Sequence, residues 1–233
     1  MENETFRLYY EESGAGEPLI LLHGNGENRM IFKAQRDYFE AKYRVIAVDT
    51  RGHGKSPRGT GPFTLEQFAE DLKALLNQMG LTKIHLLGFS DGANIAMLFA
   101  IRYPEYLKSL ILNGGNTRPS GVKLSIQIPI VMGYGLVSLI ALADKKAIAR
   151  KERLALMVKE PHISEAELAK IQAPTLVIAG TKDMIRQKET ERIRRCIPDS
   201  RLSILPGSHF LISEQPALFN QTVEKFLEEN RRM

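Results

Sequence analysis

The first residue with evident chemical potential is a serine flanked by glycines. Ser90 lies between Gly88 and Gly92 in the stretch GFSDG, which fits the pattern G-x-S-x-G. An apolar run precedes it and residues 91–103 have helical spacing, so the serine falls at a strand-to-helix turn. Small residues let such a turn close, and a helix N-terminus favours a developing negative charge. The pattern predicts a hydroxyl that attacks a carbonyl carbon.

A serine hydroxyl is a weak nucleophile at neutral pH and needs a general base. His209, in ILPGSHFLISEQP, follows the last predicted strand. Enzymes with G-x-S-x-G carry serine, acid and histidine in that chain order, and His209 alone has a suitable acid between itself and Ser90. The other histidines are a predicted core residue, one in an inserted segment, and two that follow strands and are not excluded by position: His85, His162, His23 and His53.

The acid that orients the imidazole is predicted to be Asp183, in LVIAGTKDMI, just past the penultimate strand. The competing position, after LKSLILNGG, offers Asn113 and Asn116 but no carboxylate. Taken singly, Asp183 fits a turn residue and His209 a loop residue. Three such residues, in order at three strand ends, favour the catalytic interpretation.

A fourth feature is LILLHGNGEN, which follows a predicted central strand. Its glycines allow the backbone to turn amides inward. We expect the backbone N–H groups of Asn25 and Asp91 to bind an oxyanion, with each donor contributing about 3 kcal/mol in the transition state. His23 would then shape the loop. A plain tight turn is the alternative interpretation.

The elements that must position these residues alternate along the chain. Short apolar runs are predicted strands and the longer periodic segments between them are predicted helices, which indicates an α/β fold: a mostly parallel sheet with helices on both faces. The predicted strands cover residues 6–12, 17–24, 43–50, 83–90, 107–115, 174–180 and 200–207. The predicted helices cover residues 30–41, 64–79, 91–103, 188–196 and 216–231.

One interval, residues 116–172, contains no convincing strand and much helix-like sequence. We expect it to be a helical cap inserted into a core formed by residues 1–115 and 173–233, and to cover the carboxyl ends of the strands, where open α/β sheets bind ligands. Its apolar stretch, residues 128–143, is shorter than the ~18 residues of a spanning helix and contains Pro129, Gly133 and Gly135. It is therefore predicted to be covered by protein, with a membrane-surface role as the minor alternative.

The charge and cysteine content of the chain indicate which partners and which location to expect. The net charge of +5 invites a nucleic-acid interpretation, but the basic residues are scattered, and acidic residues interleave where they crowd in residues 186–195. No nucleic-acid partner and no integral membrane segment are expected. The single cysteine, Cys196, and a polar N-terminus without signal-peptide features predict a cytoplasmic location.

No cofactor or metal is predicted. RGHGKS ends like a phosphate-binding loop, but Asp49 occupies the position of the first glycine. GNGENR begins like a dinucleotide fingerprint, but Arg29 occupies the position of its last glycine. No His, Cys and carboxylate cluster has the spacing of a metal site.

Together these segments resemble the α/β-hydrolase fold superfamily over nearly the whole chain: LILLHGNG for the oxyanion loop, VIAVDTRGHGKS for the next strand and loop, GFSDGA for the nucleophile elbow, LVIAGTKD for the acid strand and PGSHFLISEQP for the histidine loop. The resemblance implies Ser90 as nucleophile, Asp183 as acid, His209 as base, and the Asn25 and Asp91 amides as the oxyanion hole. GFSDGA followed by YPEYLKSLILNGGN is similar to the esterase-like branch that contains biphenyl-hydrolase-like enzymes. The chain departs from the pattern in its short apolar cap, in the Met-Ile-Arg after Asp183, and in an abbreviated N-terminal strand pair.

The expected function is cofactor-independent hydrolysis of a carboxylic ester, through an acyl-enzyme, on a small to medium, partly apolar molecule. The same residues could cleave a C–C bond, a lactone, a thioester or an amide, and some proteins of this fold are ligand receptors with little turnover. Asp91 beside the serine either favours amine-bearing substrates or complements the helix dipole. The sequence predicts no oligomeric state.

Overall fold

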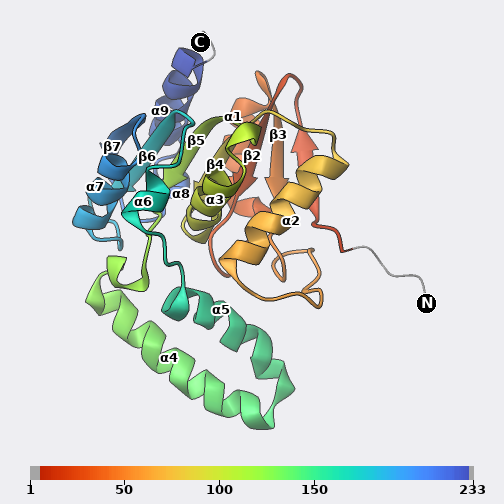
Figure 1. Cartoon of the computed structure of the whole chain (residues 1–233), viewed down its shortest axis with the longest axis vertical. Coiled ribbons are helices and arrows are strands. Elements are labelled where there is room, and N and C mark those ends of the chain that lie inside the picture. Colours follow the sequence, from red (N-terminus) through yellow and green to blue (C-terminus); the bar gives the residue numbers. More distant parts are fainter. Residues whose placement is uncertain (1–5, 231–233) are drawn as a thin grey trace.

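The computed structural model describes residues 6–230 and shows one sheet with helices packed around it (Figure 1). Within that range seven strands pair in the order β1-β3-β2-β4-β5-β6-β7, with β1 antiparallel to β3 and the other pairs parallel. The strands are β1 (Tyr10–Ser13), β2 (Glu17–Leu22), β3 (Tyr43–Val48), β4 (Ile84–Phe89), β5 (Leu107–Asn113), β6 (Thr175–Gly180) and β7 (Ser200–Leu205). Every predicted strand is present, and the mostly parallel sheet is confirmed.

The helices predicted around the sheet are also present. The α-helices are α1 (Lys33–Phe39), α2 (Leu65–Gln78), α3 (Asp91–Arg102), α4 (Leu124–Ala143), α5 (Ile148–Lys159), α6 (Glu165–Leu168), α7 (Gln187–Cys196), α8 (Leu211–Glu214) and α9 (Pro216–Asn230). Short 3-10 turns are η1 (Arg29–Phe32), η2 (Pro104–Tyr106), η3 (Pro119–Gly121) and η4 (Lys145–Ala147). The predicted helix at residues 30–41 divides into η1 and α1. Arg231, the predicted end of the last helix, lies outside the described residues.

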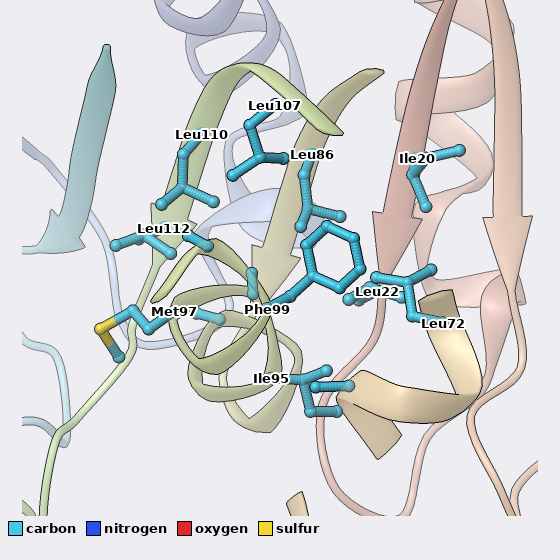
Figure 2. Packing of buried hydrophobic residues seen from close by; sticks show 14 of the residues in the cluster. Ile20, Leu22, Leu72, Leu86, Ile95, Met97, Phe99, Leu107, Leu110 and Leu112 are labelled. Atoms are coloured by element: carbon cyan, nitrogen blue, oxygen red, sulfur yellow. The ribbon is translucent and has the colours of Figure 1, made fainter. Parts of the chain in front are cut away.

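Two hydrophobic clusters hold these layers together, one on each face of the sheet, because successive strand residues point to opposite faces. On β2, Ile20 and Leu22 belong to the cluster under α2 and α3, whereas Leu19 and Leu21 belong to the cluster under α1 and α9. Figure 2 shows the ring of Phe99 of α3 directed at the face of the sheet that α2 and α3 cover, near Leu86 and Leu22. With both faces covered, the strands can be apolar throughout, which is the pattern the sequence shows.

Between β5 and β6 the chain leaves the sheet and forms α4, α5 and α6. Helices α4 and α5 form an antiparallel hairpin that projects on the side toward which the arrowheads of the parallel strands point (Figure 1). We call α4, η4 and α5 the helical hairpin. Among the described residues, α4 is the one helix long and apolar enough to cross a membrane by length and composition, and only 11% of its most apolar window is buried.

The prediction that protein covers this apolar stretch was therefore wrong. The helix is also longer than expected, because Pro129 lies inside α4 instead of ending it. Proline removes one backbone hydrogen bond in the helix interior. Gly133 and Gly135 likewise lie within the continuous helix, at positions where no atom approaches within 4 Å of a Cβ built on them. The proline and the glycines thus did not mark where α4 begins or ends. The apolar composition of α4 did not indicate that the helix is buried.

Candidate active site

Ser90 stands at the turn from β4 into α3, as its sequence context predicts. Its φ is 54° and its ψ is −121°, and it is the one non-glycine residue with positive φ in the described chain. A Cβ on Gly88 would lie 2.2 Å from the Gly92 carbonyl oxygen, and one on Gly92 would lie 2.0 Å from the Leu22 carbonyl oxygen. Glycine is thus required at both positions by backbone contact.

The hydroxyl of Ser90 makes no cap hydrogen bond to its own helix. Instead its Oγ lies 3.0 Å from Nε2 of His209, which follows β7. On the other side of the imidazole, Nδ1 lies 2.7 Å from Oδ1 of Asp183. With the ring proton on Nδ1 donated to the carboxylate, Nε2 is free to accept the serine proton.

Asp183 follows β6, and the local backbone holds its carboxylate. The N–H of Ile185 donates to Oδ1 at 2.9 Å, and the N–H of Gly180 donates to Oδ2 at 3.4 Å. The carbonyl oxygen of Asp183 accepts from Nζ of Lys123, just before α4, at 2.5 Å. Asp183 and His209 are each 4% exposed, so little water competes for their hydrogen bond.

The histidine loop is held by a carboxylate that the sequence reasoning did not single out. Glu214 of α8 accepts from the backbone N–H of Ser208 at 2.8 Å and from its hydroxyl at 2.6 Å. The rings of Phe89 and Phe210 lie 5.1 and 5.6 Å from the His209 ring. The two phenylalanine rings lie 5.8 Å from each other, so the imidazole packs with them in a cluster of three rings that restricts its position.

The glycine-rich loop after β2 lies against the serine. A Cβ on Gly24 would be 3.0 Å from the Ser90 Cβ, which is tighter than an ordinary contact, so glycine favours this close approach of the loop. Within residues 6–230 the backbone N–H groups of Asn25 and Asp91 donate to no protein acceptor. His23 joins this loop to the next one, because its Nε2 accepts from the N–H of Thr50 at 3.0 Å.

Two partly buried carboxyl groups lie near the serine. Glu27 accepts from the N–H of Gly24 at 3.2 Å, and burial raises the pKa of its carboxyl. Burial also raises the pKa of Asp91 to about 6. The Asp91 Oδ1 accepts from Nδ2 of Asn94 at 3.3 Å, whereas Oδ2 is buried without a hydrogen-bond partner in the described chain. The surroundings of Ser90 thus hold two acids whose pKa values are raised, that of Asp91 to about 6.

The remaining histidines lie apart from the serine hydroxyl. His85 is buried within β4, where Nδ1 is 2.8 Å from the Ser109 hydroxyl, as its strand position predicted. His162 is exposed in the inserted segment. Burial lowers the pKa of His23 to about 4, so this ring stays neutral and keeps its role between loops. Burial likewise lowers the pKa of His53.

The sequence reasoning missed several residues that position the site: Glu27, Glu214, Lys123 and Arg153. Arg153 of α5 offers its carbonyl oxygen to Nδ2 of Asn25 at 2.8 Å. Glu27 could have been found from its place three residues after Gly24, and Glu214 from its place in SEQP. The contacts of Lys123 and Arg153 join distant segments and leave no local signal. No group of three His, Cys, Asp or Glu side chains in the described part of the chain could hold a metal ion.

The chain is similar to proteins named as a lactonase and a hydrolase over more than nine-tenths of its length. The chain is 29% identical over 244 residues to 3-oxoadipate enol-lactonase 2 of Acinetobacter baylyi, covering 93% of this chain and 91% of that one. It is 28% identical over 264 residues to the 2-hydroxy-6-oxononadienedioate/2-hydroxy-6-oxononatrienedioate hydrolase of Escherichia coli, covering 96% and 92%.

Among solved structures, a thermophilic esterase from Thermogutta terrifontis is similar, with a TM-score of 0.78 and 28% identity over 96% of this chain and 93% of that one. The sequence profile of the alpha/beta hydrolase fold family matches residues 17–134, the part that runs from β2 through Ser90 into α4. With that match, with the seven-stranded sheet and with the serine at its strand-to-helix turn, the chain belongs to the α/β-hydrolase fold family.

Proposed function

We propose that the protein is a cofactor-independent serine hydrolase that cleaves carboxylic esters through an acyl-enzyme. The observation that carries the proposal is the hydrogen-bonded series from Ser90 Oγ through His209 to Asp183, with distances of 3.0 and 2.7 Å. Nucleophile, base and orienting acid within such distances are the arrangement that acyl transfer requires. Relatives named as an esterase and as an enol-lactonase support the hydrolase class.

In the proposed reaction, His209 Nε2 removes the proton of Ser90 as Oγ attacks the acyl carbon. The negative charge on the acyl oxygen is stabilised by the backbone N–H groups of Asn25 and Asp91, which have no other acceptor in the described chain. The imidazolium, held by Asp183, returns its proton to the leaving alcohol. His209 then activates a water molecule that attacks the acyl-enzyme and releases the acid.

We further propose that residues 116–172 act as a cap on a catalytic core made of residues 1–115 and 173–233. The support is that this segment contacts the proposed site twice, through Lys123, just before α4, to Asp183 and through Arg153, in the middle of α5, to Asn25. The apolar hairpin favours a small to medium, partly apolar substrate. The lone Cys196 fits a cytoplasmic location.

The decisive variant is Ser90→Ala. We expect turnover of a reactive p-nitrophenyl ester to fall by about 10⁶-fold, to the residual rate that the oxyanion donors alone support. The measurement is steady-state hydrolysis of an ester series graded by acyl length. The matched control is Ser125→Ala, an exposed serine on α4, which should leave turnover unchanged. A purified, folded Ser90→Ala protein with near-wild-type turnover would disprove the proposal.

Covalent labelling separates an enzyme from a ligand receptor of the same fold. A fluorophosphonate should label Ser90 stoichiometrically in wild type, and wild type should also turn over esters at a steady rate. Slow single turnover with a large ligand-induced rise in Tm would instead identify a receptor. Because the enol-lactonase relative favours a cyclic ester, an enol-lactone belongs in the substrate panel beside the open-chain esters.

A further inference from the structure

Helix α4 is apolar on most of its sides, yet most of it lies in solvent. A helix in water normally directs its apolar side chains at the core and its polar ones outward. In α4 the exposed side chains are themselves large and apolar, with exposed fractions from 38% to 82%: Leu124, Ile126, Ile128, Val131, Met132, Leu136, Leu139, Ile140 and Leu142. A continuous apolar surface of this kind marks an interaction site.

The other side of α4 is already used by α5, which fixes the hairpin. Val137 of α4 is buried, Leu156 of α5 is buried in the cluster under α2 and α3, and Nε2 of Gln127 donates to the carbonyl oxygen of Met157 at 3.1 Å. The Lys159 ammonium lies 5.5 Å from the centre of the Tyr134 ring. Figure 1 shows α4 as the outer helix of the pair, away from the sheet.

The hairpin carries a net positive charge. Residues 123–160 contain seven lysines or arginines and three acidic residues, against a net charge of +5 for the whole chain. Two of the three acids are engaged with the core: Glu152 pairs with Arg58 at 2.6 Å, and Glu160 accepts from the N–H of Leu65 at 2.7 Å. The third, Asp144, is exposed at the far end and accepts from the backbone N–H of Lys146 at 2.8 Å, and the basic residues around it leave that end with a net positive charge.

At that far end the basic side chains are free. Lys145, Lys146 and Arg150, around the turn between the two helices, are exposed and form no ion pair with any residue in the described range. They stand directly beyond Leu142, the most exposed apolar side chain of α4 at 82%. An apolar surface fringed by unpaired cations combines the two features that bind an interfacial helix to an anionic membrane.

We propose that the helical hairpin docks this protein on the surface of an anionic lipid bilayer, with α4 lying at the boundary between headgroups and acyl chains. Helix α4 does not span the bilayer, because the chain returns directly through α5, whose Arg150, Lys151, Glu152 and Arg153 would then have to enter hydrocarbon. Both ends of the hairpin are also tied to the core. The docked helix therefore lies along the membrane.

Docking would bring the proposed active site close to lipid. Lys123, just before α4, contacts the carbonyl oxygen of Asp183, and the carbonyl of Arg153, in the middle of α5, contacts the side chain of Asn25. An ester dissolved in the bilayer could then enter beside the serine without crossing water. This second step rests on the proposed function, whereas the docking itself does not.

Vesicle flotation of the full chain tests the docking. We expect binding to vesicles of phosphatidylcholine mixed with phosphatidylglycerol, weaker binding to phosphatidylcholine alone, and a decrease with added salt. Lys145→Glu/Lys146→Glu should lower partitioning by roughly thirtyfold or more, since each basic residue near an anionic surface contributes about fivefold and the two introduced carboxylates are repelled as well. The control Arg194→Glu/Arg195→Glu makes the same charge change on exposed residues of α7 and should bind nearly as wild type.

The apolar contribution has its own variant. Leu136→Ser/Leu139→Ser/Leu142→Ser should abolish flotation, while an unchanged far-UV spectrum and Tm report an intact core. Because the chain has no tryptophan, Leu139→Trp supplies a single reporter on α4 and Leu202→Trp a control on β7. Mixed vesicles should shift the emission of the first to the blue, and leave that of the second unchanged.

The results that overturn the proposal are equally definite. Absence of wild-type binding to mixed vesicles would overturn it, as would binding that the Leu→Ser variant retains. If sedimentation equilibrium instead gives a dimer that the Leu→Ser variant converts to monomer, without vesicle binding, the apolar surface joins two copies of this chain. Ser90→Ala should float like wild type, so a failure of the proposed chemistry leaves the docking result separate.

Discussion

Ser90 adopts a backbone conformation that side-chain-bearing residues avoid, with φ at 54°. Such a conformation costs about 1–3 kcal/mol and persists only where the surroundings determine it. Here the N–H of Ser90 donates to the carbonyl oxygen of Asn113 at 2.8 Å, and glycines permit the close contacts on either side. The consequence is a hydroxyl that points away from its own helix and toward His209.

Asp91 should make the stability of the fold depend on pH. Its folded-state pKa is raised by burial from 3.8 to about 6, so the folded protein binds this proton more tightly than the unfolded chain does. The stabilising contribution is therefore fully present below pH 3.8 and is lost as pH rises through about 6. Asp91→Asn, which keeps the shape without the charge, should be more stable than wild type above pH 6 by about 1–3 kcal/mol.

Urea unfolding at pH 5 and at pH 8 measures this difference. The advantage of Asp91→Asn should be larger at pH 8. Asp37→Asn is the control, because the Asp37 side chain is 56% exposed and pairs only with Lys33, so its effect should stay within about 0.5 kcal/mol. An advantage of Asp91→Asn that is the same at both pH values would contradict the ionisation account.

Residue types and order in the sequence identified the three side chains that lie in one hydrogen-bonded series, although their catalytic roles stay a prediction. Such identification works where a motif constrains the local backbone, as the glycines around Ser90 do. It did not find Glu214, which holds the loop of His209 through Ser208. Nor did it find Lys123 against Asp183, because that contact joins segments 60 residues apart.

At the scale of elements, the strands were predictable because burial on both faces of a parallel sheet leaves continuous apolar runs. Helices α2, α3 and α9 were predictable from their helical spacing. Helix α4 was not, because the usual link between apolar composition and burial fails there. Its boundaries were obscured by Pro129, which the helix accommodates in its interior.

Two glycine-to-alanine changes should have opposite effects, because one glycine is packed and the other is free. At Gly92 a Cβ would meet the Leu22 carbonyl at 2.0 Å, so Gly92→Ala must displace α3 from β2 and should destabilise the fold by several kcal/mol. At Gly133, within α4, the space is open, so Gly133→Ala should stabilise α4 by about 0.5–1 kcal/mol.

Thermal unfolding followed by circular dichroism measures the destabilisation caused by Gly92→Ala. Hydrogen exchange of α4 amides measures the stabilisation of α4 by Gly133→Ala. The prediction fails if Gly92→Ala has a Tm within a degree or so of wild type, since ~1 kcal/mol shifts Tm by about 2–4 °C in a chain of this size. An increase in α4 exchange on Gly133→Ala would equally contradict the argument.

For the whole molecule, the helical hairpin and the core are joined by few contacts. One of them is the ion pair between Arg58 and Glu152, which is partly exposed and therefore contributes less than about 1 kcal/mol to global stability. Glu152→Gln should thus leave the global free energy of unfolding nearly unchanged. It should nevertheless raise the exchange rate of α5 amides, because local opening depends on local contacts.

Hydrogen exchange resolved by mass spectrometry distinguishes local opening of α5 from global unfolding. Glu12→Gln is the control: it removes a comparably exposed pair, with Arg44, between β1 and β3, far from the hairpin in the sheet order. That variant should leave α5 exchange unaltered. Equal protection of α5 in wild type and in Glu152→Gln would show that the pair does not hold the hairpin.

The excursion that carries α4, α5 and α6 leaves the end of β5 and enters the start of β6. Before it crosses back to β6 its two arms meet, because the N–H of Ile163 donates to the carbonyl oxygen of Thr117 at 2.9 Å. The two ends of the segment between them, residues 118–162, are therefore held within one hydrogen bond of each other. A segment with such closely placed ends can be shortened, lengthened or replaced by a foreign one without re-pairing any strand. The fold thereby offers a natural grafting point, at which new substrate preferences can be acquired while the hydrolytic machinery is inherited intact.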